Sequence, residues 1–172
     1  HRRRRRPTLP RRRLSGLHCG PRRESAQGHA TAQFLLAVKY EKGEGVAQNH
    51  KEAVKWFRRA AEQGDANAQF YLGRAYHSGK GILQNHMEAV KWSRKAAEQG
   101  QGQSQWYVGL AHVLGEGVIE DKIQAYAWYN ISAANGDEDG KEWKATVAEN
   151  MTKEQIAKAQ DLSTEMIETN PK

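Results

Sequence analysis

The histidines of this 172-residue sequence are the side chains best suited to binding a metal ion or moving a proton near neutral pH. His50 and His86 follow predicted helix caps, whereas His77 and His112 lie near the ends of other predicted helices. No His-x-x-x-His spacing, and no matching carboxylate spacing, supports a metal site. The sequence therefore predicts solvated or hydrogen-bonded histidines, with no metal site and no cofactor.

Two groups of acidic residues have the side chains that general acid–base catalysis uses. Glu62 and Asp65 form one group, and residues 137–139 form the other. Both groups fall at predicted helix ends, where carboxylates stabilise the N-terminus of the following helix, and spacing alone identifies no Ser-His-Asp set. The single cysteine, Cys19, excludes an intramolecular disulfide and a cysteine-based zinc site. The sequence therefore predicts that the protein is not an enzyme and has no catalytic residue.

Glycine pairs spaced Gly-x-Gly recur along the chain and could cradle a phosphate group. They begin at Gly43, Gly79 and Gly115. None continues into the full phosphate-loop or dinucleotide-binding pattern, and the pair recurs at the same place in each part of the sequence. We interpret these pairs as turns that end helices rather than as a cofactor site.

The first 23 residues contain ten arginines and no acidic residue, so this segment is more positive than the whole chain, whose formal charge is +7. Such a composition has too little apolar surface to offset the entropy of ordering, which predicts a disordered tail over residues 1–27. Arginine runs bind the phosphates of nucleic acids and anionic surfaces, and this defines an alternative function. The mean hydropathy of −0.90 and the lack of an apolar run of about 18 residues predict a soluble protein without a membrane helix. No export signal is expected either.

An internal repeat of 36 residues organises the rest of the chain. Gly28, Gly64, Gly100 and Gly136 are separated by this interval without any insertion. The first two units share 22 of 36 residues and the second and third share 10, where average composition gives about two or three. A repeat this regular indicates a stacked array of similar units.

Each unit is predicted to form two helices. In the second unit Ala68, Leu72 and Tyr76 recur at helical spacing and form an apolar stripe. The second helix of each unit begins after a capping residue that Glu or Gln follows three positions later, as in a capping box; these caps are Asn49, Asn85 and Asp121. Three tryptophans share one phase of the repeat and are predicted to lie in the core between stacked helix pairs: Trp56, Trp92 and Trp128.

The unit reads Ala-x-Ala-Gln-Phe-x-Leu-Gly-x-x-Tyr, then Gly-x-Gly-Ile, then Asn-x-x-Glu-Ala-Val-Lys-Trp and Ala-Ala-Glu-Gln-Gly. This pattern resembles the Sel-one-like repeat (SLR) family, which is related to the tetratricopeptide repeats. The resemblance implies an all-α fold, a right-handed α/α superhelix or solenoid, that serves as a non-enzymatic adaptor for other proteins in bacteria and eukaryotes. It gives three repeats over residues 28–64, 65–100 and 101–136, followed by C-terminal capping helices over residues 137–172.

The resemblance also implies where a protein or peptide partner would bind. In superhelices of this kind the first helices line the concave face, and each presents one row of side chains. Phe34, Phe70 and Trp106 could anchor a partner, although Phe34 and Phe70 could equally pack only between helices. Positions that differ between units, such as Arg74 and His77, are expected to set specificity. The predicted binding residues, which we call the first-helix row, are Thr31, Phe34, Val38, Glu41, Asn67, Phe70, Arg74, His77, Gln103, Trp106, Leu110 and Val113.

Overall fold

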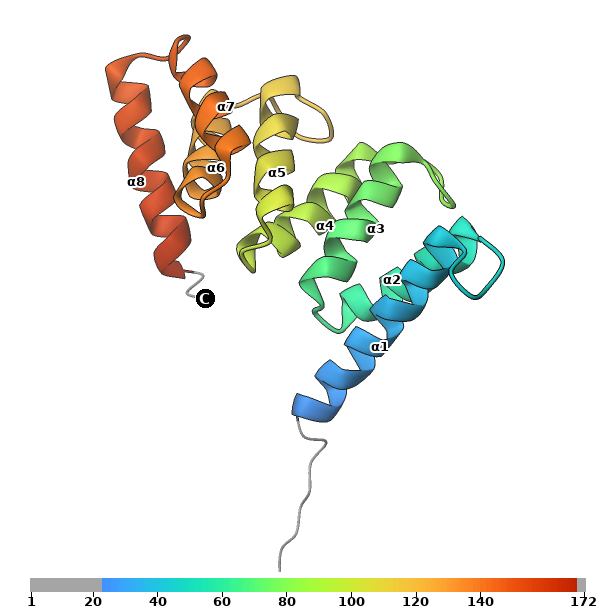
Figure 1. Cartoon of the computed structure of the whole chain (residues 1–172). Helices are drawn as coiled ribbons and strands as arrows, with labels where there is room; N and C mark the ends of the chain where they lie inside the picture. The colour runs from blue at the N-terminus through green and yellow to red at the C-terminus, as the bar shows by residue number, and fades with distance from the viewer. Residues whose placement is uncertain (1–22, 170–172) are drawn as a thin grey trace, which may run out of the picture.

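The computed structural model describes residues 23–169, and this part of the chain forms eight helices and no strand. The helices stack in chain order, with α1 and α2 at one end of the array and α7 and α8 at the other (Figure 1). The helices are α1 (Arg23–Lys42), α2 (His50–Glu62), α3 (Ala66–Ser78), α4 (His86–Glu98), α5 (Gly102–Leu114), α6 (Lys122–Ala134), α7 (Glu138–Ala148) and α8 (Lys153–Thr169). The prediction of an all-α fold built from helix pairs is confirmed.

The N-terminal boundary of the helical array differs from the prediction. Helix α1 begins at Arg23, so it includes residues 23–27 of the segment assigned to a disordered tail. These residues read Arg-Glu-Ser-Ala-Gln, which contains no proline or glycine and extends a helix readily. The rest of the predicted tail lies outside the described residues. None of the helices over residues 23–169 has the length and apolar content that crossing a membrane requires.

Short polar side chains begin the second helix of each pair, as the sequence predicts. Asn49 Oδ1 accepts the backbone N–H of Glu52 at 3.1 Å. The Glu52 carboxylate does not return this bond, because the backbone N–H of Asn49 already donates to Tyr40 O at 2.9 Å; it pairs with Lys55 instead. The same pattern recurs at the start of α4. The caps are therefore confirmed, but the reciprocal half of the capping box is replaced by a bond to the preceding helix.

Gly73 allows the two helices of the second repeat to touch. A Cβ atom at this position would lie 2.4 Å from Ser93 Oγ and 3.0 Å from Ala89 O, both in α4. Any side chain would push α3 and α4 apart, since real contacts of this kind are longer than 3 Å. The close helix approach expected from a glycine inside a helix is therefore present, and it offsets the helix propensity lost there.

Buried glutamines connect successive repeats through a set of hydrogen bonds that we call the amide ladder. Gln69 Nε2 in α3 donates to Ala61 O at the end of α2, at 3.1 Å. Its Oε1 accepts from Gln99 Nε2 at 2.8 Å, and the same two bonds recur one repeat later through Gln105. Gln69 and Gln105 are buried, and an unpaired buried amide is costly. The ladder therefore fixes how each repeat sits on the one before it.

The tryptophans that share one phase of the repeat are not equally buried. Trp92 is 7% exposed and Trp128 is 2% exposed, so the predicted core position is confirmed for both. Trp56 is only half-buried, and the Arg59 guanidinium lies 4.5 Å from the centre of its ring. Trp128 receives additional cover from Met166 of α8. The depth of the tryptophan therefore depends on which helices follow it.

Candidate functional site

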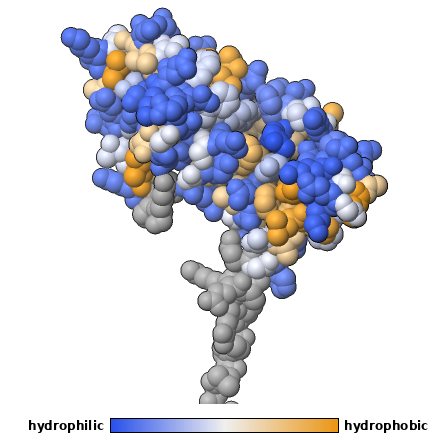
Figure 2. All heavy atoms as spheres, viewed as in Figure 1, coloured by the Kyte–Doolittle hydropathy of each residue, from blue (hydrophilic) through white to orange (hydrophobic). Residues whose placement is uncertain are grey.

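The first-helix row lies on α1, α3 and α5, and every one of its twelve residues is at least partly exposed. On the face shown in Figure 2 the surface is mostly hydrophilic, with apolar area gathered towards the α1 end. Eight residues of the row are half-buried, which suits side chains that contribute both to packing and to a surface. The four exposed ones are Thr31, Asn67, Arg74 and Gln103.

The aromatic members of the row take part in packing. The Phe34 ring centre lies 6.0 Å from that of Phe57 and 5.6 Å from that of Tyr71, so it connects the first repeat to the second. The Phe70 ring meets Tyr71 edge to face at 5.4 Å, and Trp106 packs against the core cluster formed by α6, α7 and α8. The contacts of Phe34 favour the alternative that the sequence left open, in which it packs between helices, whereas the Phe70 contact lies within α3.

Helix α2 packs against α3, and α4 packs against α5. We call these contacts the first junction and the second junction. In each junction a loop glycine rests on the backbone of the preceding repeat. A Cβ at Gly81 would lie 2.3 Å from His50 O, and a Cβ at Gly117 would lie 2.3 Å from His86 O. The residue before each glycine is therefore brought close to the histidine that begins α2 or α4.

The first junction surrounds one carboxylate with basic groups. Glu41, at the end of α1, places Oε2 2.8 Å from His50 Nδ1 and Oε1 3.8 Å from Arg74 Nη2. The Arg74 guanidinium lies 4.4 Å from the centre of the Tyr71 ring, and its side chain is 49% exposed. Lys80 lines the same cavity of about 280 Å³. Glu41 carries one negative charge, and Arg74 and Lys80 carry one positive charge each, so the group keeps a net positive charge that can attract a further anion.

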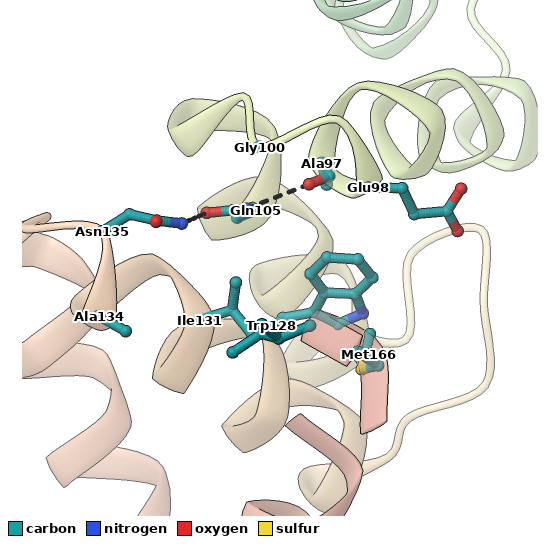
Figure 3. Close-up of a pocket in the computed structure, with 10 residues that line it drawn as sticks. Ala97, Glu98, Gly100, Gln105, Trp128, Ile131, Ala134, Asn135 and Met166 are labelled. Carbon is teal, nitrogen blue, oxygen red and sulfur yellow. Dashed lines mark hydrogen bonds between the residues drawn. The ribbon is translucent and has the colours of Figure 1, made fainter. Parts of the chain in front are cut away.

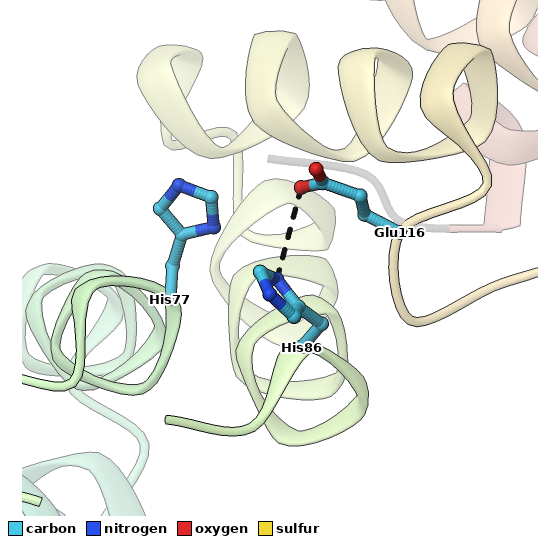
Figure 4. A group of neighbouring side chains, drawn as sticks. All are labelled: His77, His86 and Glu116. Atoms are coloured by element: carbon cyan, nitrogen blue, oxygen red, sulfur yellow. Dashed lines mark ion pairs between the residues drawn. The ribbon is translucent and has the colours of Figure 1, made fainter. Parts of the chain in front are cut away.

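The second junction has a different set of polar residues at the matching positions. His77 at the end of α3, His86 at the start of α4 and Glu116 after α5 point toward one another (Figure 4). One candidate ligand atom from each residue lies within 4.8 Å of those of the other two. His86 Nδ1 is 3.7 Å from Glu116 Oε2, and the Tyr107 hydroxyl is 3.1 Å from His77 Nδ1. This set combines two imidazoles with one carboxylate, a donor combination that metal sites use.

A second pair of matching positions also differs between the junctions. Arg58 Nη2 donates to the Tyr76 hydroxyl at 2.7 Å, whereas Arg94 Nη2 lies 3.1 Å from His112 Nε2. A guanidinium only donates, so Nε2 accepts and the proton is on His112 Nδ1, which lies 3.3 Å from Ile119 O. Burial lowers the pKa of His112; the Ile119 carbonyl opposes this shift, and the Arg94 charge adds to it.

A comparison with protein families decides what kind of repeat this is. The pattern described as Sel1 repeat matches three consecutive segments, residues 30–65, 66–101 and 102–137. The chain belongs to the Sel1 repeat family. The matched segments begin one or two residues after the starts of the repeats that the sequence predicted, and the resemblance inferred from the sequence is confirmed.

Solved structures of other Sel1 repeat (SLR) proteins resemble this one. The chain is 34% identical to c5321, a protective antigen present in uropathogenic Escherichia coli strains, with a TM-score of 0.69 over 86% of this chain and 40% of that one. It is 40% identical to a Sel1 repeat protein from Oxalobacter formigenes, with a TM-score of 0.64 over 71% of this chain and 47% of that one. The chain therefore spans less than half the length of these two proteins.

Helicobacter pylori cysteine rich protein B shares the fold, with a TM-score of 0.55 at 19% identity over 72% of this chain and 97% of that one. The sequences of curated proteins include no match to the chain.

The sequence analysis missed the group at the second junction. Its residues are 9 and 30 positions apart along the chain, far from the spacing of a local metal motif. Their positions in the Sel1 repeat did contain a signal. His86 follows a cap, His77 lies nine residues before it, and Glu116 occupies the variable position of the next Gly-x-Gly loop. Because stacking brings that loop onto the preceding cap, reading residues at matching repeat positions would have found the group.

A separate cavity of about 360 Å³ opens between α4, α6 and α8 (Figure 3). Trp128, Ile131 and Met166 form its apolar wall. Gln105 at its edge is already paired within the amide ladder, to Ala97 O and to the Asn135 amide. The cavity can therefore hold an apolar group, and the polar groups that could orient one are the Trp128 indole Nε1–H, which has no hydrogen-bond partner, and the Glu98 carboxylate.

Proposed function

We propose that this Sel1 repeat chain is a non-enzymatic adaptor that binds a peptide or protein segment along the first-helix row. Sel1 repeats generally bind proteins. The observation that carries the proposal is that the row stays accessible through all three repeats, while the second helices bury most of their alanines and, in α4 and α6, their tryptophans. His50, His77 and His112 form hydrogen bonds with carboxylate, phenol, guanidinium or carbonyl groups, and none of these bonds reaches a serine.

Differences along the row would make binding specific. One position of the repeat is Val38 in α1, Arg74 in α3 and Leu110 in α5. An extended segment crossing these three helices would meet an apolar, a cationic and again an apolar side chain. Such an alternation selects one register of the partner over its neighbours, because a shifted segment would leave an unpaired charge or an exposed apolar group.

The charge at the first junction indicates the chemistry of the partner. Arg74 is held over the Tyr71 ring and keeps about half of its side chain exposed. Lys80 adds a second positive charge to the same cavity. A guanidinium fixed in this way suits a carboxylate. The partner segment is therefore expected to carry an acidic side chain or its C-terminal carboxylate opposite Arg74, with apolar residues on either side.

Selection of displayed peptides on the full chain, followed by fluorescence anisotropy of the enriched sequences, tests this proposal. We expect acidic peptides to be enriched and Arg74→Ala to weaken them at least tenfold, because the partner's charge loses its counter-ion. The matched control is Lys91→Ala, which removes an exposed charge from α4 outside the row. Enriched peptides that bind Arg74→Ala as tightly as the parent would contradict the proposal.

The arginine-rich segment supports the alternative function, a binder of nucleic acid or of another anionic surface. Its ten arginines precede the row, and residues 1–22 lie outside the described part of the chain. Such binding is expected to weaken with salt by a log slope of about −0.9 for each DNA phosphate contacted. Deleting residues 1–23 separates the two functions, since an adaptor keeps its peptide and a binder that depends on the tail loses its DNA.

A further inference from the structure

We propose that His77, His86 and Glu116 together bind one divalent transition-metal ion, Zn²⁺ or an ion of similar softness, across the second junction. The proposal does not depend on the adaptor function, although His77 belongs to the first-helix row. Two of the three residues come from the second repeat and the third comes from the loop of the third repeat. A bound ion would therefore clamp two repeats together.

The distances fit a metal ion after small side-chain movements. The candidate ligand atoms lie within 4.8 Å of one another. A tetrahedral zinc ion with bonds of about 2.0–2.1 Å holds its ligand atoms about 3.3 Å apart. Closing the group requires shifts of about 1.5 Å, which side-chain rotation supplies. Figure 4 shows that the three side chains already face one another across the gap that the ion would occupy.

His86 has a polar atom that the protein leaves unused. Its Nδ1 atom is buried, has no hydrogen-bond partner and lies 3.7 Å from the Glu116 carboxylate. Buried polar atoms nearly always have a partner, because an unpaired one forfeits its bonds with water. At the first junction the equivalent atom of His50 is 2.8 Å from a carboxylate oxygen. A metal ion between His86 and Glu116 would supply the partner that His86 lacks.

The surroundings hold the ligands in place. The Tyr107 hydroxyl contacts His77 Nδ1, and the two rings meet edge to face at 5.3 Å. Burial, with a smaller contribution from the Glu116 charge, raises the pKa of Tyr107 to about 12, so it stays a neutral phenol that orients the ring. Gly117 fixes the loop on the His86 backbone. Restraints of this kind around the ligands raise metal affinity because less entropy is lost on binding.

The donor set selects the class of metal. Imidazole nitrogen suits Zn²⁺, Cu²⁺ and Ni²⁺, whereas Mg²⁺ and Ca²⁺ prefer oxygen alone. Three protein ligands leave a fourth position for water or for a side chain of a bound partner. The side chains of His86 and Glu116 are 37% and 42% exposed, so an ion can reach them from solvent.

The first junction provides a natural comparison within the same chain. Its matching residues are Glu41, His50 and Lys80. It therefore has one histidine and one carboxylate, with an ammonium group in place of the third ligand. A cation would be repelled there, which makes His50 the matched control for His86.

Titration calorimetry with ZnCl₂ on the full chain tests the site, with Cys19→Ser in every protein so that the thiol does not contribute. We expect one zinc ion to bind at the second junction, and His86→Ala and Glu116→Gln each to weaken it at least tenfold. His50→Ala should stay within twofold of the parent. Glu116→Gln keeps the shape of an exposed side chain, so it reports on ligand charge even if His86→Ala unfolds. Unchanged affinity in Glu116→Gln, or an equal loss in His50→Ala, would overturn the proposal.

A transplant of the site provides a gain-of-function test. Glu41→His and Lys80→Glu together give the first junction the same donor set around His50, and Tyr71 already stands at the position of Tyr107. We expect the number of bound zinc ions to rise from one to two, while Lys80→Glu alone leaves it at one. A number that stays at one in the double variant would show that this residue set does not make a site, and would overturn the assignment.

Discussion

At the first junction a carboxylate at the end of α1 faces basic side chains of α2 and α3. At the second junction the end of α3 carries a histidine instead, and the carboxylate comes from the loop after α5. The backbone contacts are the same in both, since Gly81 and Gly117 rest on equivalent carbonyls and the amide ladder crosses each junction. Stacking therefore depends on glycine, glutamine and small apolar residues. The charged residues beside these contacts differ in sign between the two junctions, so each junction presents its own set of polar groups.

Truncating the matching tryptophans would test how far the two junctions differ in packing, and this is the largest effect we expect. Trp92→Ala should cost about 3–5 kcal/mol of unfolding free energy, the usual range for a buried aromatic. Trp56→Ala should cost about 1–3 kcal/mol, because its ring is only half-buried. Urea unfolding of the two variants measures the difference. Equal losses would mean that exposure does not govern the contribution of this position.

Adding one methyl group at the loop glycines would test whether both junctions depend on the same backbone contact. Gly45, Gly81 and Gly117 all have φ near +75°, so alanine costs about 1–2 kcal/mol at each from backbone strain. A Cβ added at Gly81 or Gly117 would also lie 2.3 Å from a carbonyl oxygen, whereas a Cβ added at Gly45 would have nothing within 4 Å.

We therefore expect Gly81→Ala and Gly117→Ala to lose a further ~1–3 kcal/mol of unfolding free energy relative to the Gly45→Ala control, which is the usual cost of overpacking. Thermal unfolding measures the comparison. A Gly117→Ala protein as stable as Gly45→Ala would show that the loop does not press on the second junction.

The smallest expected effect is a pH dependence confined to the second junction. Burial lowers the pKa of His112 in the folded state. Below the ordinary histidine pKa of about 6.5, the unfolded chain takes up a proton there that the folded chain does not. Stability attributable to His112 is therefore complete above this pH, falls as the pH decreases and levels off below the folded-state pKa.

His112→Tyr copies the matching residue Tyr76, which carries no charge in this range. The urea midpoint of the variant should fall less than that of the parent between pH 7.5 and pH 5.5. The two proteins differ at residue 112 alone, so the difference between the two profiles isolates His112. If the urea midpoints of the parent and the variant fell in parallel with pH, the prediction would be wrong, and His112 would have to move away from Arg94 when its imidazole becomes charged.

The fold was predictable from sequence because its determinants repeat at one interval. The glycines that end helices and the Asn or Asp caps recur every 36 residues, and the structure has them where the sequence placed them. The burial of Trp56 was not predictable, since it depends on which helices cover each end of the array. The start of α1 was misplaced because charge and proline dominate the segment before Arg23.

The candidate site was predictable only in part. The sequence placed the first-helix row on the first helix of each pair, where the structure has these residues, but it did not show that Phe34 contacts Phe57 and Tyr71, which requires knowing how the repeats stack. The group around His86 was missed because its members come together across a junction. Such a contact has no local spacing and emerges only when one repeat is superposed on the next.

The amide ladder has a consequence for how the length of such a protein can change. Each repeat contains both halves of the link, a glutamine in its first helix and, near the end of its second, a carbonyl that can accept a bond from the next glutamine, as with Gln69 and Ala97. Tandem duplication or loss of a whole 36-residue unit thus regenerates every bond at the new seam. An insertion of any other length would leave a buried amide without its carbonyl. The ladder ends where Lys141 of α7 replaces the next glutamine, because the ammonium group has no oxygen to accept a bond from a following amide.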